Sequence, residues 1–264
     1  MIIPADGDEG AALNQAHTAL TSTLSLVRSS MMRLHESCRK HIEEITSELQ
    51  GPMENVLALE GDFGDWLSVI AKRPEAEQLL SAHRDFGIAF YGVSSGLYRQ
   101  AFSSLRSFIE VSVAAIYLSS TELKRRQWVS GKIDISWSAL TSDDDGIYSK
   151  AYVEAFCPAA LGEHAEMRSA LRRCYRRCSE YVHGNVETSS LLPASIQFDL
   201  SVANEWLIVA NDALEVVVHC LMVRYFGEFD ADQRLRVEPA LEGNFPNLAS
   251  VRKLLGLPME DNSK

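Results

Sequence analysis

Residues 11–50 have the sequence AALNQAHTALTSTLSLVRSSMMRLHESCRKHIEEITSELQ, and their pattern is helical. Apolar or small side chains recur at steps of three and four residues: Leu13, Ala16, Leu20, Leu24, Val27, Met31, Leu34, Cys38, His41, Ile45 and Leu49. This spacing places one stripe along a single helix, and Gly51-Pro52 predicts that the helix stops there. At ~1.5 Å per residue the helix is about 60 Å long. Its stripe therefore needs cover from a long bundle, for which 54–118 could supply the helices, or from another chain.

The rest of the chain continues this helical periodicity. We expect helices over 53–71, 75–90, 94–118, 147–156, 163–182, 202–226 and 248–255. Only 128–146 breaks the pattern, where alternating Ile133 and Ile135 allow a short strand in a surface excursion. The sequence thus predicts an all-α, extended helical bundle. A disordered leader (1–10) precedes a single domain (11–264), which consists of an N-terminal helical extension (11–90), a core (94–226) and a tail (227–264).

The overall charge limits the kinds of partner. The 264 residues include 25 Lys or Arg and 36 Asp or Glu, which gives a net charge of −11. Such a charge opposes indiscriminate binding to nucleic acid or to anionic lipid. Any phosphate-binding site must therefore be a local basic patch.

Targeting and redox signals favour the cytoplasm. The first residues, MIIPADGDE, have neither the basic region nor the apolar run of a signal peptide. No stretch approaches the ~18 uninterrupted apolar residues of a membrane span. The five cysteines form no CxxC pair, and Cys174 and Cys178 have the spacing of small core residues on one helix face. We therefore expect a cytoplasmic protein that does not enter a membrane.

Motifs for cofactors and metals are missing from the sequence. It contains no HExxH, no Walker-type loop, no GxSxG and no GxGxxG. The acidic run Asp143–Asp145 lacks the spacing of a calcium loop. We expect neither a cofactor nor a metal.

The densest basic patch lies on the helix expected over 163–182. It carries five arginines, Arg168, Arg172, Arg173, Arg176 and Arg177, and it leads into Ser179-Glu180-Tyr181-Val182-His183-Gly184. On a continuous helix Arg176, Glu180 and His183 share one face, whereas Arg177 points about 120° away from His183. Gly184-Asn185 can break the helix and change that relation.

The patch has two interpretations. It is either a solvated basic face, with His183 capping the last carbonyls, or a phosphate site. In a phosphate site an arginine grips the phosphate and His183 acts as general acid or base.

The segment Arg176–His183 resembles the Arg-to-His signature of the HEPN superfamily, in which an Arg lies shortly before a His within an all-α bundle. Six residues separate Arg176 from His183, and five separate Arg177 from it. The stretch Arg106–Glu110, on a long apolar helix, is also similar to the helix that precedes this motif in HEPN-like bacterial proteins. The resemblance covers about 94–226. One difference is that Cys178 follows Arg177, where active members place Asn, Asp or His.

The resemblance implies a protein of a bacterial defence or toxin-type system. It would be either a metal-independent endoribonuclease or a non-catalytic helical module that binds and regulates a partner effector. In the enzyme, His183 moves protons and Arg177 or Arg176 holds the phosphate, at a site where two HEPN units meet. Glu180, Ser179, Arg106 and Glu110 then serve as support, most simply as an ion-pair network beneath the motif. The expected partners are RNA and either a second copy, as a homodimer, or a larger assembly.

Overall fold

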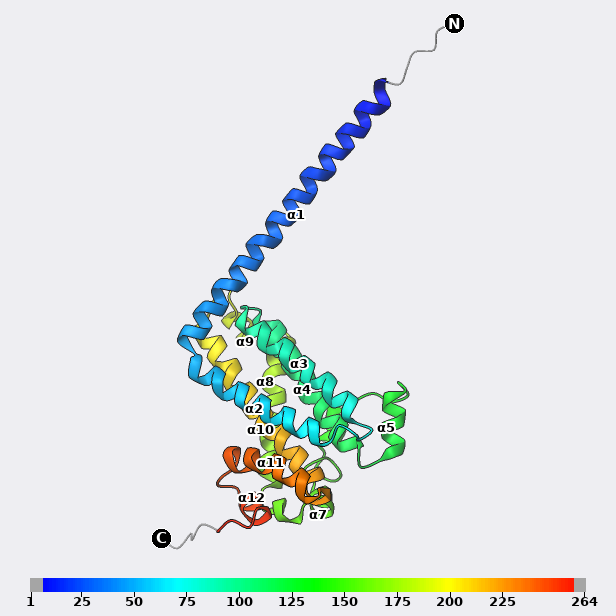
Figure 1. Ribbon diagram of the computed structural model, residues 1–264, viewed down its shortest axis with the longest axis vertical. Coiled ribbons are helices and arrows are strands. Elements are labelled where there is room, and N and C mark those ends of the chain that lie inside the picture. Colours follow the sequence, from blue (N-terminus) through cyan, green and yellow to red (C-terminus); the bar gives the residue numbers. More distant parts are fainter. Residues whose placement is uncertain (1–6, 259–264) are drawn as a thin grey trace.

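Helices make up the regular structure of the described part of the chain. The computed structural model describes the backbone over residues 7–258 and the side chains over residues 21–258. The first half contains α1 (Gly7–Glu48), α2 (Gln50–Val69), α3 (Ala76–Ser94), α4 (Tyr98–Leu118), α5 (Glu122–Val129) and α6 (Trp137–Leu140) (Figure 1). The second half contains α7 (Lys150–Phe156), α8 (His164–Val182), α9 (Val186–Leu191), α10 (Leu200–Tyr225), α11 (Ala231–Asn244) and α12 (Ala249–Leu254). Two short 3-10 helices, Pro158–Gly162 and Phe226–Glu228, complete the list. The prediction of an all-α fold is confirmed.

The prediction of a short strand within 128–146 is wrong. The backbone N–H groups of Gly131 and Lys132 bond back to the carbonyls of Trp128 and Gln127, so the chain closes in turns there. Within residues 7–258 no strand lies beside this segment, and an isolated strand has no partner for its backbone groups.

The start of the chain also differs from the prediction. Residues 7–10, assigned to a disordered leader, already belong to α1. Residues 1–6 of that leader lie outside the described residues.

The predicted helix stop at Gly51-Pro52 is a bend between two helices. α1 ends at Glu48 and α2 begins at Gln50, so the chain turns at Leu49. Pro52 is tolerated in the first turn of α2, because N–H groups there have no partner within the helix. Gly51-Pro52 therefore marks the end of α1 to within a few residues, but a second helix begins immediately.

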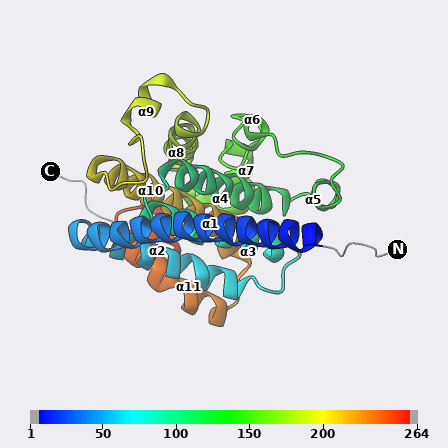
Figure 2. The ribbon, with the colours of Figure 1, turned by 90° about the horizontal axis from the view of Figure 1, so that it is seen from above.

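Among the described side chains of α1 (residues 21–48), those at the C-terminal end pack on the rest of the molecule. His41, Ile45 and Leu49 are buried at this root, where α1 contacts α2, α3 and α10. The remainder projects from the body as an arm (Figure 1), and it is straight in both views (Figures 1 and 2). Along it Leu24, Val27, Met31 and Leu34 are between 45% and 61% exposed. One alternative from the sequence was that the helices of 54–118 cover the stripe. This alternative is wrong for the exposed part, because α2 turns into the body and away from the arm (Figure 1).

The body is built around α10. Every residue from Val216 to Tyr225 is buried, and α2, α4 and α8 pack around this helix. α3 lies along α4, and Phe108 of α4 makes edge contacts with Phe63 of α2 and with Phe86 of α3. This packing fixes α4 and α10 on two sides of α8.

In the part of the chain that the structure describes, two helices have the length and composition of membrane spans. They are Tyr98–Leu118 and Leu200–Glu228, and 61% and 78%, respectively, of their most apolar windows is buried within the molecule. In the body these side chains form the hydrophobic core.

The C-terminal tail contains a helix that the sequence analysis missed. α11 begins with a capping box in which Asp230 and Gln233 exchange hydrogen bonds, and Pro239 lies inside the helix. No helix was expected around Pro239, but Val237 and Leu241 are buried and α11 packs on α2. Packing therefore outweighs the local cost of the proline. The short helix expected over 248–255 is present as α12.

Candidate functional site

The amphipathic helix α8 holds the residues singled out in the sequence. Leu171, Cys174, Cys178 and Tyr181 are buried, so this stripe fixes the rotation of the helix. One flank of α8 consequently faces α4 and the other faces α10. The basic residues of the motif divide between these two flanks.

The end of α8 is shaped by Gly184 and Asn185. Gly184 has a φ of +68°, the left-handed region that glycine adopts without steric cost. Asn185 then caps α9, because its side-chain oxygen accepts the Glu187 N–H at 3.0 Å. Thr188 ties the new helix back to α8 through the Glu180 carbonyl at 2.8 Å. The break between the two helices leaves His183 exposed.

His183 pairs with an arginine from another helix. Arg106 of α4 lies with Nη1 2.8 Å from His183 Nε2. A guanidinium can only donate, so Nε2 is the acceptor and the ring proton is on Nδ1. His183 is therefore presented as a neutral imidazole whose lone pair points at Arg106.

A tyrosine and a glutamate hold Arg106 in place. Arg106 Nη2 donates to the Tyr175 hydroxyl at 2.6 Å and to Glu110 at 3.3 Å. The Tyr175 hydroxyl donates in turn to Glu110 at 2.7 Å. We call His183, Arg106, Tyr175 and Glu110 the α4-facing cluster.

Aromatic packing fixes the α4-facing cluster from one side. Trp137 of α6 stacks on the Tyr175 ring, with 3.9 Å between ring centroids and 15° between planes. Burial, with the hydrogen bond to Glu110, raises the pKa of Tyr175. The hydroxyl therefore stays protonated and keeps its donor role toward Glu110.

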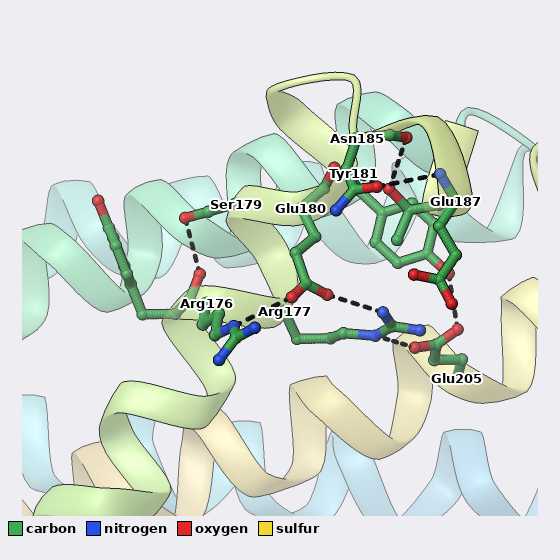
Figure 3. A network of polar contacts seen from close by, with 10 residues as sticks. Arg176, Arg177, Ser179, Glu180, Tyr181, Asn185, Glu187 and Glu205 are labelled. Atoms are coloured by element: carbon green, nitrogen blue, oxygen red, sulfur yellow. Dashed lines mark hydrogen bonds and ion pairs between the residues drawn. The ribbon is translucent and has the colours of Figure 1, made fainter. Parts of the chain in front are cut away.

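Arg177 points to the other flank of α8. It donates to Glu205 of α10 and, at 2.8 Å, to Glu180. The Tyr181 hydroxyl also donates to Glu205, at 2.6 Å, and Arg176 donates to Glu180 at 3.1 Å. We call Arg176, Arg177, Glu180 and Glu205 the α10-facing cluster; Figure 3 shows it from close by.

Charge neutralisation dominates the α10-facing cluster. The hydrogen bond from Arg177, with that from Arg176, holds the pKa of Glu180 below its usual value. Glu205, more than any other group, raises the pKa of Arg177. The cluster lines an open groove of about 370 Å³ between α8 and α10. Because two carboxylates already engage Arg177, it has less capacity for a phosphate than an unpaired arginine.

The structure thus brings together only part of the predicted site. His183, Arg106 and Glu110 meet, whereas within the described residues no hydrogen bond joins His183 to Arg176 or Arg177. The predicted pairing of Arg176 with Glu180 is present. The remaining supporting residue, Ser179, bonds to the Tyr175 carbonyl within its own helix, at 2.8 Å.

The sequence analysis did not identify three residues that belong to the two clusters or contact them: Tyr175, Trp137 and Glu205. Tyr175 lies two turns before His183 on the same side of the helix, and this eight-residue spacing was a usable signal. Glu205 is one of three acidic residues on the largely apolar helix α10, and a charge on such a helix indicates a specific partner. For Trp137 no local pattern pointed to the stacking.

A second arginine lies beside the cluster. Arg99 is seven residues before Arg106 on α4, and it donates to the Ser189 hydroxyl at 3.4 Å. A side chain at Gly184 would come within 3.9 Å of its guanidinium, so Arg99 is next to the end of α8. Arg99 also lines an open cavity of about 550 Å³, with the α3–α4 turn and residues 192–196. The exposed edge of the site therefore offers His183 and two arginines.

Among the described residues no group of His, Cys, Asp and Glu side chains could hold a metal ion. Comparison of the chain with protein-family models, with curated proteins and with solved structures gives no match. The function must therefore be argued from the site itself.

Proposed function

We propose that this chain is a HEPN-like protein of a bacterial defence or toxin-type system that acts on RNA in the cytoplasm as a metal-independent endoribonuclease. In this proposal His183 is the acid/base group and Arg106 of α4 holds the phosphate. The observation that carries it is the exposed contact between His183 Nε2 and Arg106 Nη1 at 2.8 Å. Arg106 therefore takes the role of partner to His183 that the sequence suggested for Arg176 or Arg177.

The geometry suits attack by an RNA 2′-hydroxyl on the adjacent phosphate. His183 Nε2 is unprotonated and takes the hydroxyl proton as the O2′–P bond forms. Arg106 turns its Nη1 from His183 to the phosphate oxygens and stabilises their growing charge. The P–O5′ bond breaks, the leaving oxygen takes a proton from water, and the hydroxide so formed takes up the proton held by His183, which returns to its neutral form. The products are a 2′,3′-cyclic phosphate and a 5′-hydroxyl.

Arg106 is prepared for this movement by its other contacts. Its Nη2 remains bonded to Tyr175 while Nη1 is exchanged between His183 and the phosphate. Arg99, on the same side of α4, can contact a neighbouring phosphate. Two arginines on one side of α4 provide the local basic patch that an otherwise acidic protein needs to bind RNA.

The test is RNA cleavage by the purified full-length chain in EDTA, with a 5′-labelled single-stranded RNA as substrate. We expect His183→Ala to reduce the rate by about 10²–10⁴-fold and Arg106→Ala by about 10²–10³-fold. The matched control is Arg176→Ala. Arg176 is 82% exposed on α8, the helix that leads into His183, and its replacement should change the rate by no more than about threefold. Circular dichroism and thermal unfolding establish that each variant folds.

The outcomes separate the alternatives. A loss in Arg177→Ala with little change in Arg106→Ala would place the phosphate on the α10-facing cluster and contradict this assignment. Equal losses in the two variants would also contradict it, because Arg106 would then have no distinct role. Absence of cleavage by the wild type would remove the nuclease. The non-catalytic interaction module would then be the better reading, since a second observation, the exposed stripe of α1, favours it independently.

A further inference from the structure

The stripe along α1 changes its environment part of the way along the helix. From Leu24 to Ile45 its residues alternate at steps of three and four, which is the heptad spacing of helices that pack side by side. The body covers the stripe at His41 and Ile45, but Leu24, Val27, Met31 and Leu34 are exposed. One continuous packing surface is therefore covered at its root and uncovered along the arm.

The flanks of the stripe permit pairing of two identical helices. Residues 11–42 contain one acidic residue, Glu36, and four Lys or Arg. Arg39 is paired with Glu36 and Glu43 on its own helix. The positions that border the stripe between Leu24 and Leu34 are Thr23, Arg28 and Ser30. No block of like charge there opposes a second copy of the same surface.

The body restricts the direction of a partner helix. His41 and Ile45 belong to the same stripe, so the body occupies the side of α1 that a partner helix must use farther along the arm. In a parallel pair both bodies would lie at the same end and on the inner side of the two arms, where they would collide. In an antiparallel pair each partner arm ends near the root, and the two bodies lie at opposite ends.

We propose that two copies of this chain associate through their α1 arms, packed antiparallel along the exposed stripe. An overlap of about 28 residues is about 42 Å long, and it holds the bodies apart. The association requires neither His183 nor RNA, so it is independent of the ribonuclease.

Sedimentation equilibrium of the full chain tests the association. The wild type should be a dimer, with twice the 29.3 kDa of one chain. Val27→Glu with Leu34→Glu places charges inside the stripe and should weaken the dimer at least about 100-fold. The matched control, Leu26→Glu with Met32→Glu, changes two exposed apolar residues on the opposite side of the same helix. It should leave the dimer constant within about threefold.

Each result decides the proposal. A wild type that remains a monomer at tens of micromolar overturns the proposed dimer. A monomer is the result expected if the arm binds a different protein instead of a second copy. A dimer that tolerates the stripe variant also overturns it, because the contact is then elsewhere. Loss in the stripe variant alone supports the arms as the interface.

Spin-label distances test the direction. Labels are placed at Ser29→Cys or Glu43→Cys in a Cys38→Ser chain, whose other cysteines are buried. In an antiparallel pair the distance between labels grows by about 3 Å for each residue toward the root, so the two sites differ by roughly 40 Å. A parallel pair gives nearly equal distances at both sites and contradicts the proposal.

Discussion

The two flanks of α8 use the same residue types for different purposes. On the α10 side Arg177 lies between two carboxylates, Glu180 and Glu205. On the α4 side Arg106 has one carboxylate, Glu110, and shares its remaining capacity with Tyr175 and His183. The first arrangement is satisfied and joins two helices. The second leaves a histidine lone pair and a guanidinium at an exposed helix end, where a ligand can exchange with them.

The difference shows that distance along the sequence does not select the partner of His183. Arg177 is turned away from His183 by the rotation that buries Cys178 and Tyr181, and the exposed Arg176 bonds to Glu180 instead. Arg106, 77 residues earlier in the chain, is brought close because α4 packs against α8. A motif defined by short spacing is therefore completed by a residue outside that spacing.

The largest stability effect should come from the α10-facing cluster. Glu205→Ala removes the acceptor of both Arg177 and the fully buried Tyr181, and we expect it to lower the free energy of unfolding by about 2–3 kcal/mol. Glu110→Ala on the other flank leaves Arg106 and Tyr175 bonded to each other and should cost about 1 kcal/mol. Urea unfolding of both variants measures the difference. Equal losses would show that the two flanks are equally structural.

A smaller effect should appear in the pH dependence. Because Arg177 and Arg176 lower the pKa of Glu180 in the folded chain, the carboxylate stabilises the fold above its unfolded pKa of about 4.3. That contribution is lost as the pH falls through the folded pKa.

Replacement of Glu180 isolates this contribution. Glu180→Gln should destabilise the chain by less than about 1 kcal/mol near neutral pH, and the difference from wild type should shrink in acid below about pH 4. Unfolding free energies measured across this range provide the test. A difference that does not vary with pH would mean that the ionised form of Glu180 contributes no stability.

The parts of the structure that sequence could predict are those set by local periodicity. The stripes of α1, α4, α8 and α10 repeat over many residues, so the all-α class followed from them. α11, which contains Pro239, was not predicted, because the cost of the proline is local whereas the packing that offsets it comes from α2.

The candidate site depends on contacts that periodicity does not describe. Which arginine meets His183 is set by how α4 and α8 pack, and the stacking of Trp137 on Tyr175 depends on the path of an irregular segment. The exposure of the α1 stripe could not be predicted either. The apolar pattern indicates that another surface packs on the stripe, but it does not indicate whether that surface belongs to the same chain or to another.

The central claim, that His183 pairs with Arg106 rather than with Arg177, can be tested without a substrate. Long-range ¹H–¹⁵N correlation spectra of the imidazoles, recorded in mildly alkaline buffer, report which ring nitrogen carries the proton. We predict the Nδ1–H tautomer for His183 in the wild type and in Arg177→Ala, and a shift toward Nε2–H in Arg106→Ala. An Nε2–H tautomer in the wild type, or a response to Arg177→Ala and not to Arg106→Ala, would contradict the account.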